Sequence, residues 1–254
     1  MNTLTRTART AGALYLVYVI VQIAADVIGR SSTIVYGDAA MTAANIAASA
    51  GRFNVGFVID LLAALLFVLS AWALYRLLKP VNPDVALLFL MLNATGVAIQ
   101  CVSDIFLVSS SLLLSSADFL KPYAPDQLQA LAMTSLYFYK NGYQIAQIFF
   151  GAWILPLGYL VYKSGFLPKA LGIVLMVHCC TWSATALQFF VFPSFTAIAY
   201  VSWPLGFVAE VGLSLSLLFM ALHVPRRAAE PDSIHSGSAA LPSPAGEGAT
   251  PRSR

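Results

Sequence analysis

The chain contains little charge and few of the residues that carry common site chemistry. Asp, Glu, Lys and Arg make up 10% of its 254 residues, and it has three cysteines and three histidines. The cysteines, Cys101, Cys179 and Cys180, lie in apolar stretches, which excludes a secreted disulfide framework. Neighbouring residues on a helix point about 100° apart, so His178 and the two adjacent cysteines cannot aim at one ion. We expect neither a metal nor a cofactor.

Several enzyme signatures are also missing. The sequence has no Walker-type glycine loop, no HExxH motif and no GxSxG nucleophile elbow. No catalytic residue can therefore be named. The net charge is only +3, which is typical of contact with anionic lipid and not of nucleic-acid binding. The expected partner is the lipid bilayer, and the sequence names no protein partner.

The chain is instead rich in long stretches of apolar residues. Hydrophobic residues are 59% of the sequence, and the mean hydropathy is +0.78. A membrane span needs about 20 apolar residues. We predict an all-α membrane protein whose residues 1–223 form a bundle of six transmembrane helices, followed by a disordered Pro- and Ser-rich tail at 224–254. The spans are expected at about 11–28, 53–78, 85–114, 143–162, 167–190 and 200–222.

Basic residues near the span ends predict the orientation. One side would carry Arg6, Arg9, Arg76, Lys79, Lys163, Lys169, Arg226 and Arg227, and the other Arg30, Arg52, Lys121 and Lys140. The richer side is expected to be cytoplasmic, so both termini should lie in the cytoplasm, with the protein in the inner membrane. Lys140 is either a counter-charge to Asp104 or Asp118 or a lysine that reaches up to the interface.

The first outer connection contains a predicted short helix. Asp38 can cap the segment GDAAMTAANIAAS, in which Thr42, Asn45 and Ser49 continue a polar face at helical spacing. This segment is either a helix lying over the mouth of the bundle or an ordinary surface connector.

Four carboxylates interrupt the apolar spans, namely Asp26, Asp60, Asp104 and Glu210. A charge at the centre of a transmembrane helix costs about 2.5–3.5 kcal/mol on insertion scales, so such residues are functional candidates. Counted from the expected outer ends, Asp26 and Asp104 are shallow, Asp60 is roughly 10 Å deep and Glu210 is near the midplane.

Amides share the helix faces of these acids. Gln100 lies four residues before Asp104, and Gln144 belongs to a polar stripe of the fourth span. Two interpretations remain open. The stripes either hydrogen-bond neighbouring helices, with the acids protonated or paired, or line an outward-facing acidic pocket formed by Asp26, Asp60, Gln100, Asp104, Gln144 and Glu210.

The pocket hypothesis predicts a protein that binds or transports a small polar or cationic ligand or a lipid headgroup. A second hypothesis is an intramembrane lipid-modifying enzyme in which Asp60 or Glu210 acts as general base. A third is a structural or regulatory membrane subunit whose polar stripes bind partner helices.

Five segments together resemble one bacterial membrane family, called domain of unknown function 4386. They are GDAAMTAANIAAS at 37–49, LLKPVN at 77–82, PDQLQALA at 125–132, KSGFLPKALG at 163–172 and EVGLSLSLL at 210–218. The resemblance implies a six-helix protein of the bacterial cytoplasmic membrane, and it implies no particular activity or catalytic residue.

Overall fold

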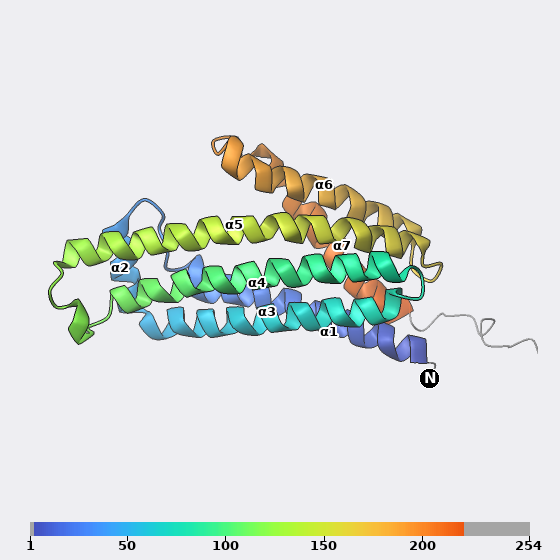
Figure 1. The fold of residues 1–254 in the computed structure, drawn as a ribbon, viewed down its shortest axis with the longest axis horizontal. Coiled ribbons are helices and arrows are strands. Elements are labelled where there is room, and N and C mark those ends of the chain that lie inside the picture. The colour runs from blue at the N-terminus through green and yellow to red at the C-terminus, as the bar shows by residue number, and fades with distance from the viewer. Residues whose placement is uncertain (1–2, 221–254) are drawn as a thin grey trace, which may run out of the picture. The chain divides into compact units, whose positions relative to one another are not determined.

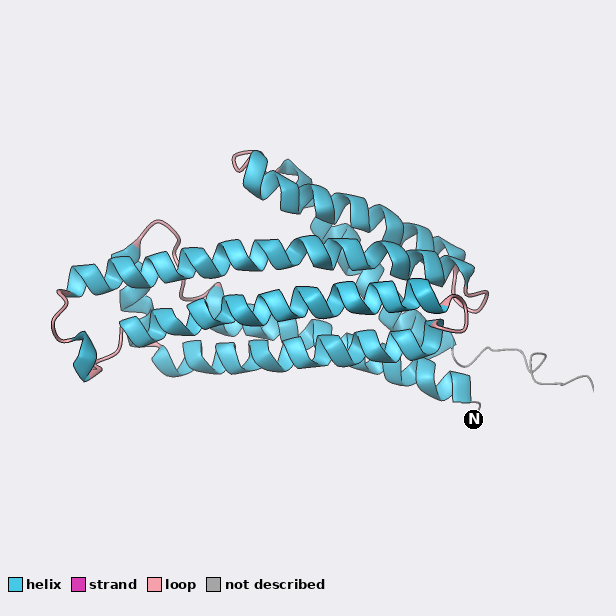
Figure 2. Cartoon of the chain, in the orientation of Figure 1, coloured by secondary structure: helices cyan, strands magenta, loops and turns pink. Residues whose placement is uncertain are grey.

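The computed structural model describes residues 3–220, which fold almost entirely into helices joined by short loops (Figure 1, Figure 2). Six helices are long and apolar enough to cross a membrane, and this part of the chain has no strand. They are α1 (Thr3–Ala25) with its continuation η1 (Asp26–Arg30), α3 (Ala50–Leu78), α4 (Pro83–Leu113), α5 (Pro125–Lys163), α6 (Lys169–Val191) and α7 (Ala197–Met220). The predicted all-α bundle of six membrane-spanning helices is confirmed. The predicted tail at 224–254 lies outside the described residues.

Caps and prolines set several helix starts. The Asn82 side chain accepts a hydrogen bond from the Val85 N–H at 3.0 Å, and Pro83 occupies the first turn of α4. Pro125 opens α5 in the same way. The turn at 79–82 is short, so α3 and α4 are antiparallel neighbours, whereas a longer connection that contains Asp118–Leu120 leads from α4 to α5.

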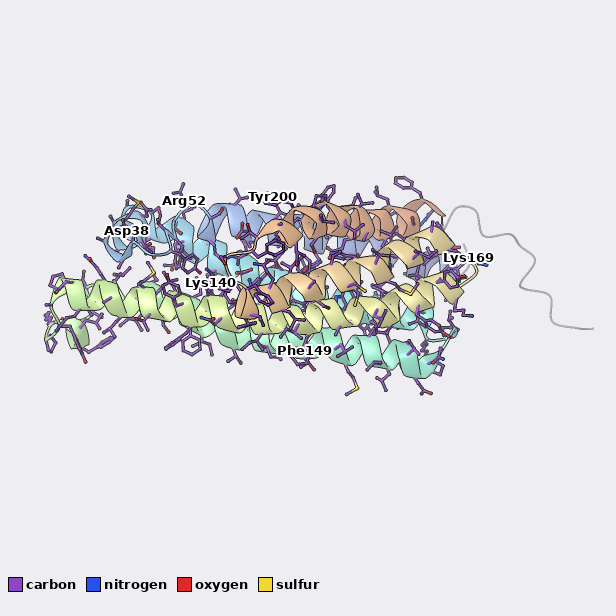
Figure 3. All side chains as sticks on the ribbon, turned by 90° about the horizontal axis from the view of Figure 1, so that it is seen from above. Asp38, Arg52, Lys140, Phe149, Lys169 and Tyr200 are labelled. Atoms are coloured by element: carbon purple, nitrogen blue, oxygen red, sulfur yellow. The ribbon has the colours of Figure 1, made fainter. Side chains whose placement is uncertain are left out.

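The six long helices form a closed ring. Each packs against the next one in the sequence, and α7 returns to pack against α1 (Figure 1). We call the end with Thr3 and the turns at 79–82 and 164–168 the N-terminal end, and the end with residues 31–49, 114–124 and 192–196 the α2 end. Asp38 and Lys169 mark these opposite ends in Figure 3.

Aromatic side chains fill the N-terminal half of the ring. The rings of Tyr18 and Phe67 stack at 4.1 Å between centroids, and Trp153 meets Phe67 edge-on at 5.2 Å. Phe89 and Tyr15 pack against the same Trp153. Such pairs add about 0.5–1.5 kcal/mol each beyond the area they bury. This half of the bundle is therefore a packed apolar core.

The outward faces of the helices are also apolar. Val58, Val102 and Phe207 are each about 60% exposed, and many other large apolar side chains are similarly exposed. Soluble monomers rarely expose continuous apolar surface of this extent. Lipid is the solvent that suits these faces, which makes the chain a multi-pass membrane protein.

The α2 end extends beyond the shorter helices. With 39 residues, α5 is roughly 58 Å long at 1.5 Å per residue, whereas the hydrocarbon core is about 30 Å thick. Lys140 Nζ lies 5.4 Å from the ring of Phe189, close to the last residue of α6. The first 15 residues of α5, 125–139, therefore reach past the end of α6.

The predicted short helix of this end is present as α2 (Ala39–Ala48). The Asp38 carboxylate accepts a hydrogen bond from the Met41 N–H at 2.8 Å, and α2 packs against α5 and α3. Its polar face holds the preceding loop, because Thr42 bonds the Val35 carbonyl at 3.0 Å and Asn45 donates to the Thr33 carbonyl at 3.2 Å. A short turn, η2 (Asp118–Leu120), completes this end.

Candidate ligand site around Arg30

Two glycines bring the first two spans into backbone contact. A Cβ on Gly56 of α3 would overlap the Cα of Gly29 in η1, and a Cβ on Gly29 would lie 3.0 Å from the Cα of Gly56. Small residues allow this close approach in membranes. Arg30 follows Gly29 directly, and Asp60 lies one turn after Gly56, so the crossing places Arg30 and Asp60 opposite each other.

The end of the first span is wound as a π turn. The Ser31 N–H donates to the Asp26 carbonyl at 3.0 Å, five residues back, and the Thr33 hydroxyl donates to the Gly29 carbonyl. A π turn holds one more residue than an α turn and occurs frequently at functional sites. The extra residue rotates the end of the helix, and Arg30 leaves it toward the bundle.

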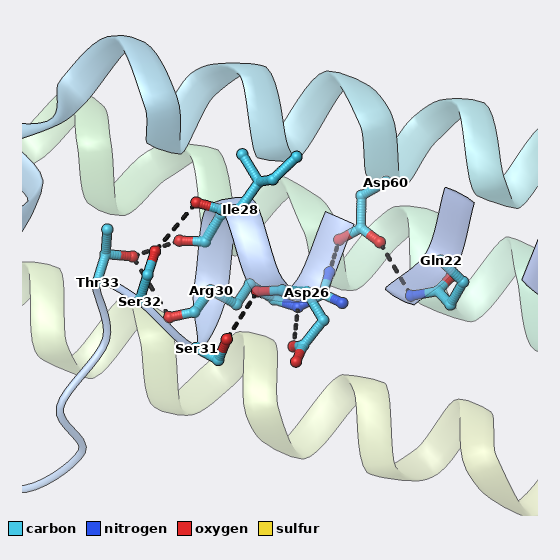
Figure 4. A network of polar contacts seen from close by, with 9 residues as sticks. Gln22, Asp26, Ile28, Arg30, Ser31, Ser32, Thr33 and Asp60 are labelled. Atoms are coloured by element: carbon cyan, nitrogen blue, oxygen red, sulfur yellow. Dashed lines mark hydrogen bonds and ion pairs between the residues drawn. The ribbon is translucent and has the colours of Figure 1, made fainter. Parts of the chain in front are cut away.

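Arg30 binds two carboxylates at once (Figure 4). Its Nη1 donates to Oδ2 of Asp60, and its Nε donates to Oδ1 of Asp26 at 3.2 Å. Gln22 approaches Asp60 from the other side, donating from Nε2 to Oδ1 at 3.3 Å. Figure 4 shows the guanidinium between the two acids, with Gln22 beyond Asp60.

The two ion pairs differ in burial and therefore in how much they contribute to stability. The side chains of Arg30 and Asp60 are 12% and 1% exposed, whereas Asp26 is 54% exposed. An exposed pair contributes about 0–1 kcal/mol, but removing one partner of a buried pair costs about 3–5 kcal/mol. The Arg30–Asp60 pair is therefore the structurally important one. The exposed Asp26 connects it to the surface at the α2 end.

Two tyrosines of α5 complete the surroundings of Arg30. Arg30 is close enough to act electrostatically on both Tyr139 and Tyr143. The two rings lie 5.9 Å apart. Tyr139 is almost fully buried. The charged guanidinium is thus bound by side chains of η1 and α3 and lies near two tyrosines of α5.

Asp104 of α4 is the unusual member of this group. It is 1% exposed and near enough to Arg30 for the two charges to interact, yet neither of its carboxylate oxygens has a hydrogen-bond partner. Gln100, one turn earlier and 3% exposed, leaves its Nε2 without an acceptor. Buried polar groups are nearly always hydrogen-bonded. These three unpaired atoms are the exception to that rule in the Arg30 group.

The structure brings together most of the six residues that the sequence suggested. Asp26, Asp60 and Asp104 surround Arg30, and Gln100 adjoins Asp104. Gln144 is half-buried on α5 beside Tyr143 and makes no side-chain hydrogen bond within residues 3–220. Glu210 of α7 lies elsewhere: its charge acts on Tyr15 and Tyr18 of α1, not on Arg30.

Within residues 3–220, Lys140 forms no ion pair with an acid. Its Nζ lies over the ring of Tyr36 at 4.5 Å, and Asp118 pairs instead with Lys121 at 2.6 Å. The interfacial position that was the other expectation for Lys140 stays a prediction. Partial burial raises the pKa of Tyr36 to about 12, while the nearby Arg30 acts in the opposite direction. The phenol of Tyr36 stays protonated at neutral pH.

We did not predict from the sequence that Arg30 belongs to this site, because we assigned Arg30 to the basic residues of the outer side. One signal could have found it. Arg30 lies four residues after Asp26, the spacing of a helical ion pair, directly after a glycine at the end of the first span. Among the described residues, no three His, Cys, Asp or Glu side chains gather in a way that would hold a metal ion.

These features define a multi-pass helical membrane protein with an ion-paired arginine and an unpaired buried carboxylate in the α2 half of its ring. Residues 10–221 match the family described as a domain of unknown function, DUF4386. The chain belongs to this family, as the sequence segments suggested. No curated protein and no solved structure matches the chain.

Proposed function

We propose that the protein binds a small primary ammonium compound beside Arg30, with the ammonium group on Asp104. The observation that carries the proposal is the pair of unpartnered carboxylate oxygens of Asp104, 1% exposed, next to the unpartnered Nε2 of Gln100. A buried carboxylate without a partner is unfavourable by several kcal/mol, on the order of the penalty for a buried ion. A ligand that donates hydrogen bonds to Asp104 removes this penalty.

The local charge favours a cation. Three carboxylates, Asp26, Asp60 and Asp104, surround the single guanidinium of Arg30, which already donates to the first two. When the three carboxylates and the guanidinium are all ionised, negative charge therefore exceeds positive charge. An ammonium ion supplies it, and it carries the donors that Asp104 needs.

The amide of Gln100 adds a second requirement. Its Nε2 needs a hydrogen-bond acceptor. The ligand should therefore also carry an oxygen atom, one or two bonds from the carbon to which the ammonium nitrogen is attached. Ethanolamine is a small, stable compound that carries both groups. The same chemistry occurs in a free amino alcohol and in the headgroup of phosphatidylethanolamine, and the exposed Asp26 offers an entry at the α2 end to either.

A binding role fits better than the enzyme hypothesis. A general base must be free to accept a proton, but Asp60 already accepts from Arg30 and from Gln22. Asp104 is free of such bonds, and within residues 3–220 none of the titratable side chains near it, Arg30, Cys101, Tyr139 and Tyr143, is hydrogen-bonded to its carboxylate. Binding, as a sensor or transporter, requires only the groups that are present.

The ligand class can be tested by thermal unfolding of the purified full chain. Ethanolamine at millimolar concentration should raise the melting temperature, because a ligand present at 100 times its Kd stabilises by about 2.7 kcal/mol. Ethylene glycol, which lacks the charge, should have no effect. If only nanodiscs containing phosphatidylethanolamine stabilise the protein, compared with phosphatidylglycerol, then the headgroup is the ligand. Equal melting in all conditions contradicts the proposal.

We also propose that the α2 end faces the outside of a bacterial cytoplasmic membrane and that both termini are cytoplasmic. The N-terminal end carries Arg76, Lys79, Lys163 and Lys169 besides Arg6 and Arg9. At the α2 end, the charge of Arg30 is offset by Asp26 and Asp60. Basic residues are more numerous at the N-terminal end, which favours this orientation.

Cysteine labelling in intact cells should report this orientation. In a variant without Cys101, Cys179 and Cys180, a cysteine at the exposed Ser116 should react with a membrane-impermeant maleimide. A cysteine at the exposed Asp84, at the other end, should react only after the cells are opened. The reverse pattern would show that the termini lie outside.

A further inference from the structure

Glu210 is the acid that the Arg30 group does not use. It lies near the middle of α7, 13 residues after Ala197, which is roughly 20 Å along the helix at 1.5 Å per residue. It is half-buried, and within residues 3–220 it has no basic partner. A carboxyl group at such a depth is stable only when it is protonated or hydrated.

The groups that face Glu210 are few. From α1 the hydroxyls of Tyr15 and Tyr18 are near enough to interact with its charge. From α6 the titratable neighbour is His178, whose ring lies against Gly206, one turn before Glu210. His178 is 1% exposed, and neither of its ring nitrogens has a partner. None of these groups supplies a fixed positive charge.

Polar side chains connect Glu210 to the Arg30 group along two routes. On α1, Gln22 lies one turn after Tyr18 and donates to Asp60 at 3.3 Å. On α5, Tyr143 is near enough to interact electrostatically with Tyr18 and also with Arg30 and Asp104. Toward the N-terminal end lie the Ser214 hydroxyl, which donates to the Glu210 carbonyl at 2.9 Å, and then the edge-on rings of Phe67 and Trp153. Among the described residues, the side chains that lead from Glu210 toward the α2 end are therefore more polar than those that lead toward the N-terminal end.

We propose that Glu210 exchanges a proton for the ammonium ligand, a step that rests on the proposed function. When the ammonium ion binds at Asp104, the O–H bond of the Glu210 carboxyl group breaks. The proton passes through hydroxyls such as that of Tyr18 to water at the α2 end, and the carboxylate keeps the electron pair. One positive charge enters the bundle as one leaves, so the net charge of the membrane interior is unchanged.

Titration calorimetry of the full chain in detergent tests this exchange, with ethanolamine as the probe. Ethanolamine is fully protonated at neutral pH, so protons released on binding come from the protein. Binding enthalpies measured in two buffers of different ionisation enthalpy give the number released. We expect about one proton per ethanolamine bound for the wild type and for Glu210→Asp, and about none for Glu210→Gln with binding retained.

Each outcome decides one of the two proposals. Equal proton release by the wild type and Glu210→Gln, or no release by the wild type, overturns the exchange and leaves the binding proposal intact. Absence of ethanolamine binding to the wild type overturns the binding proposal itself. If Glu210→Gln melts far below the wild type, then Glu210→Asp decides: the exchange requires that Glu210→Asp releases about one proton on binding ethanolamine, and binding without proton release overturns it.

Discussion

Replacing Arg30 with methionine will lower the free energy of unfolding by about 3–5 kcal/mol, because Asp60 then remains buried without a counter-charge. Methionine keeps much of the length of the arginine side chain. The loss of stability is therefore due to the missing charge and its hydrogen bonds more than to lost packing. Asp60 is 1% exposed, and the amide of Gln22 alone cannot compensate for its charge. The measurement is equilibrium unfolding of the purified protein in mixed detergent.

A double-mutant cycle isolates the pair. In the variant Arg30→Met with Asp60→Asn the buried charge is gone, so most of the lost stability should return. Arg52→Met is the matched control, because Arg52 is exposed at the start of α3 and forms no ion pair within the described part of the chain. A loss for Arg30→Met no larger than that for Arg52→Met would show that the pair does not stabilise the fold.

Placing a methyl group at Gly56 will be the second large perturbation. A Cβ at this position would overlap the backbone of Gly29, and backbone cannot move aside as the end of a side chain can. Overpacking of this kind costs about 1–3 kcal/mol. The spans α1 and α3 must separate, which draws Arg30 away from Asp60. Gly56→Ala should therefore lower the melting temperature and also weaken ethanolamine binding.

Gly51 provides the control for this change on the same helix. A Cβ at Gly51 meets nothing within 4 Å, so Gly51→Ala should leave stability unchanged or raise it by up to about 1 kcal/mol through better helix propensity. If Gly56→Ala and Gly51→Ala melt at the same temperature, the close crossing of the two spans is not real.

The architecture could be predicted from the sequence because hydropathy in a membrane is a local property. Runs of about 20 apolar residues must become helices, since lipid offers no hydrogen bonds to the backbone. Prolines such as Pro83 and Pro125 then divide the runs. The cap of α2 by Asp38 was predictable for the same reason, because a cap depends only on its next few residues.

The partners of the acids could not be predicted in the same way. They depend on which helices become neighbours and on the rotation of each helix. Arg30 reaches Asp60 only because η1 is a π turn and because Gly29 and Gly56 touch. Neither feature has a strong sequence signal. The single acidic pocket suggested by the sequence is, in the structure, an Arg30 group with Asp26, Asp60 and Asp104, and Glu210 at a separate place.

Asp104 is the residue on which the functional account depends. In contrast to Arg30→Met, the substitution Asp104→Asn should not reduce stability, because it removes a buried carboxylate that has no partner. A loss of binding in this variant would therefore not be a consequence of unfolding. Asp118→Asn is the control, since Asp118 is 90% exposed and pairs only with Lys121.

Equilibrium dialysis of radiolabelled ethanolamine against the three purified proteins tests the central claim most directly. The account predicts saturable binding of about one ethanolamine per chain for the wild type and for Asp118→Asn, and loss of that binding for Asp104→Asn, as expected when a charge-assisted contact is removed. Binding by Asp104→Asn equal to that of the wild type would contradict it.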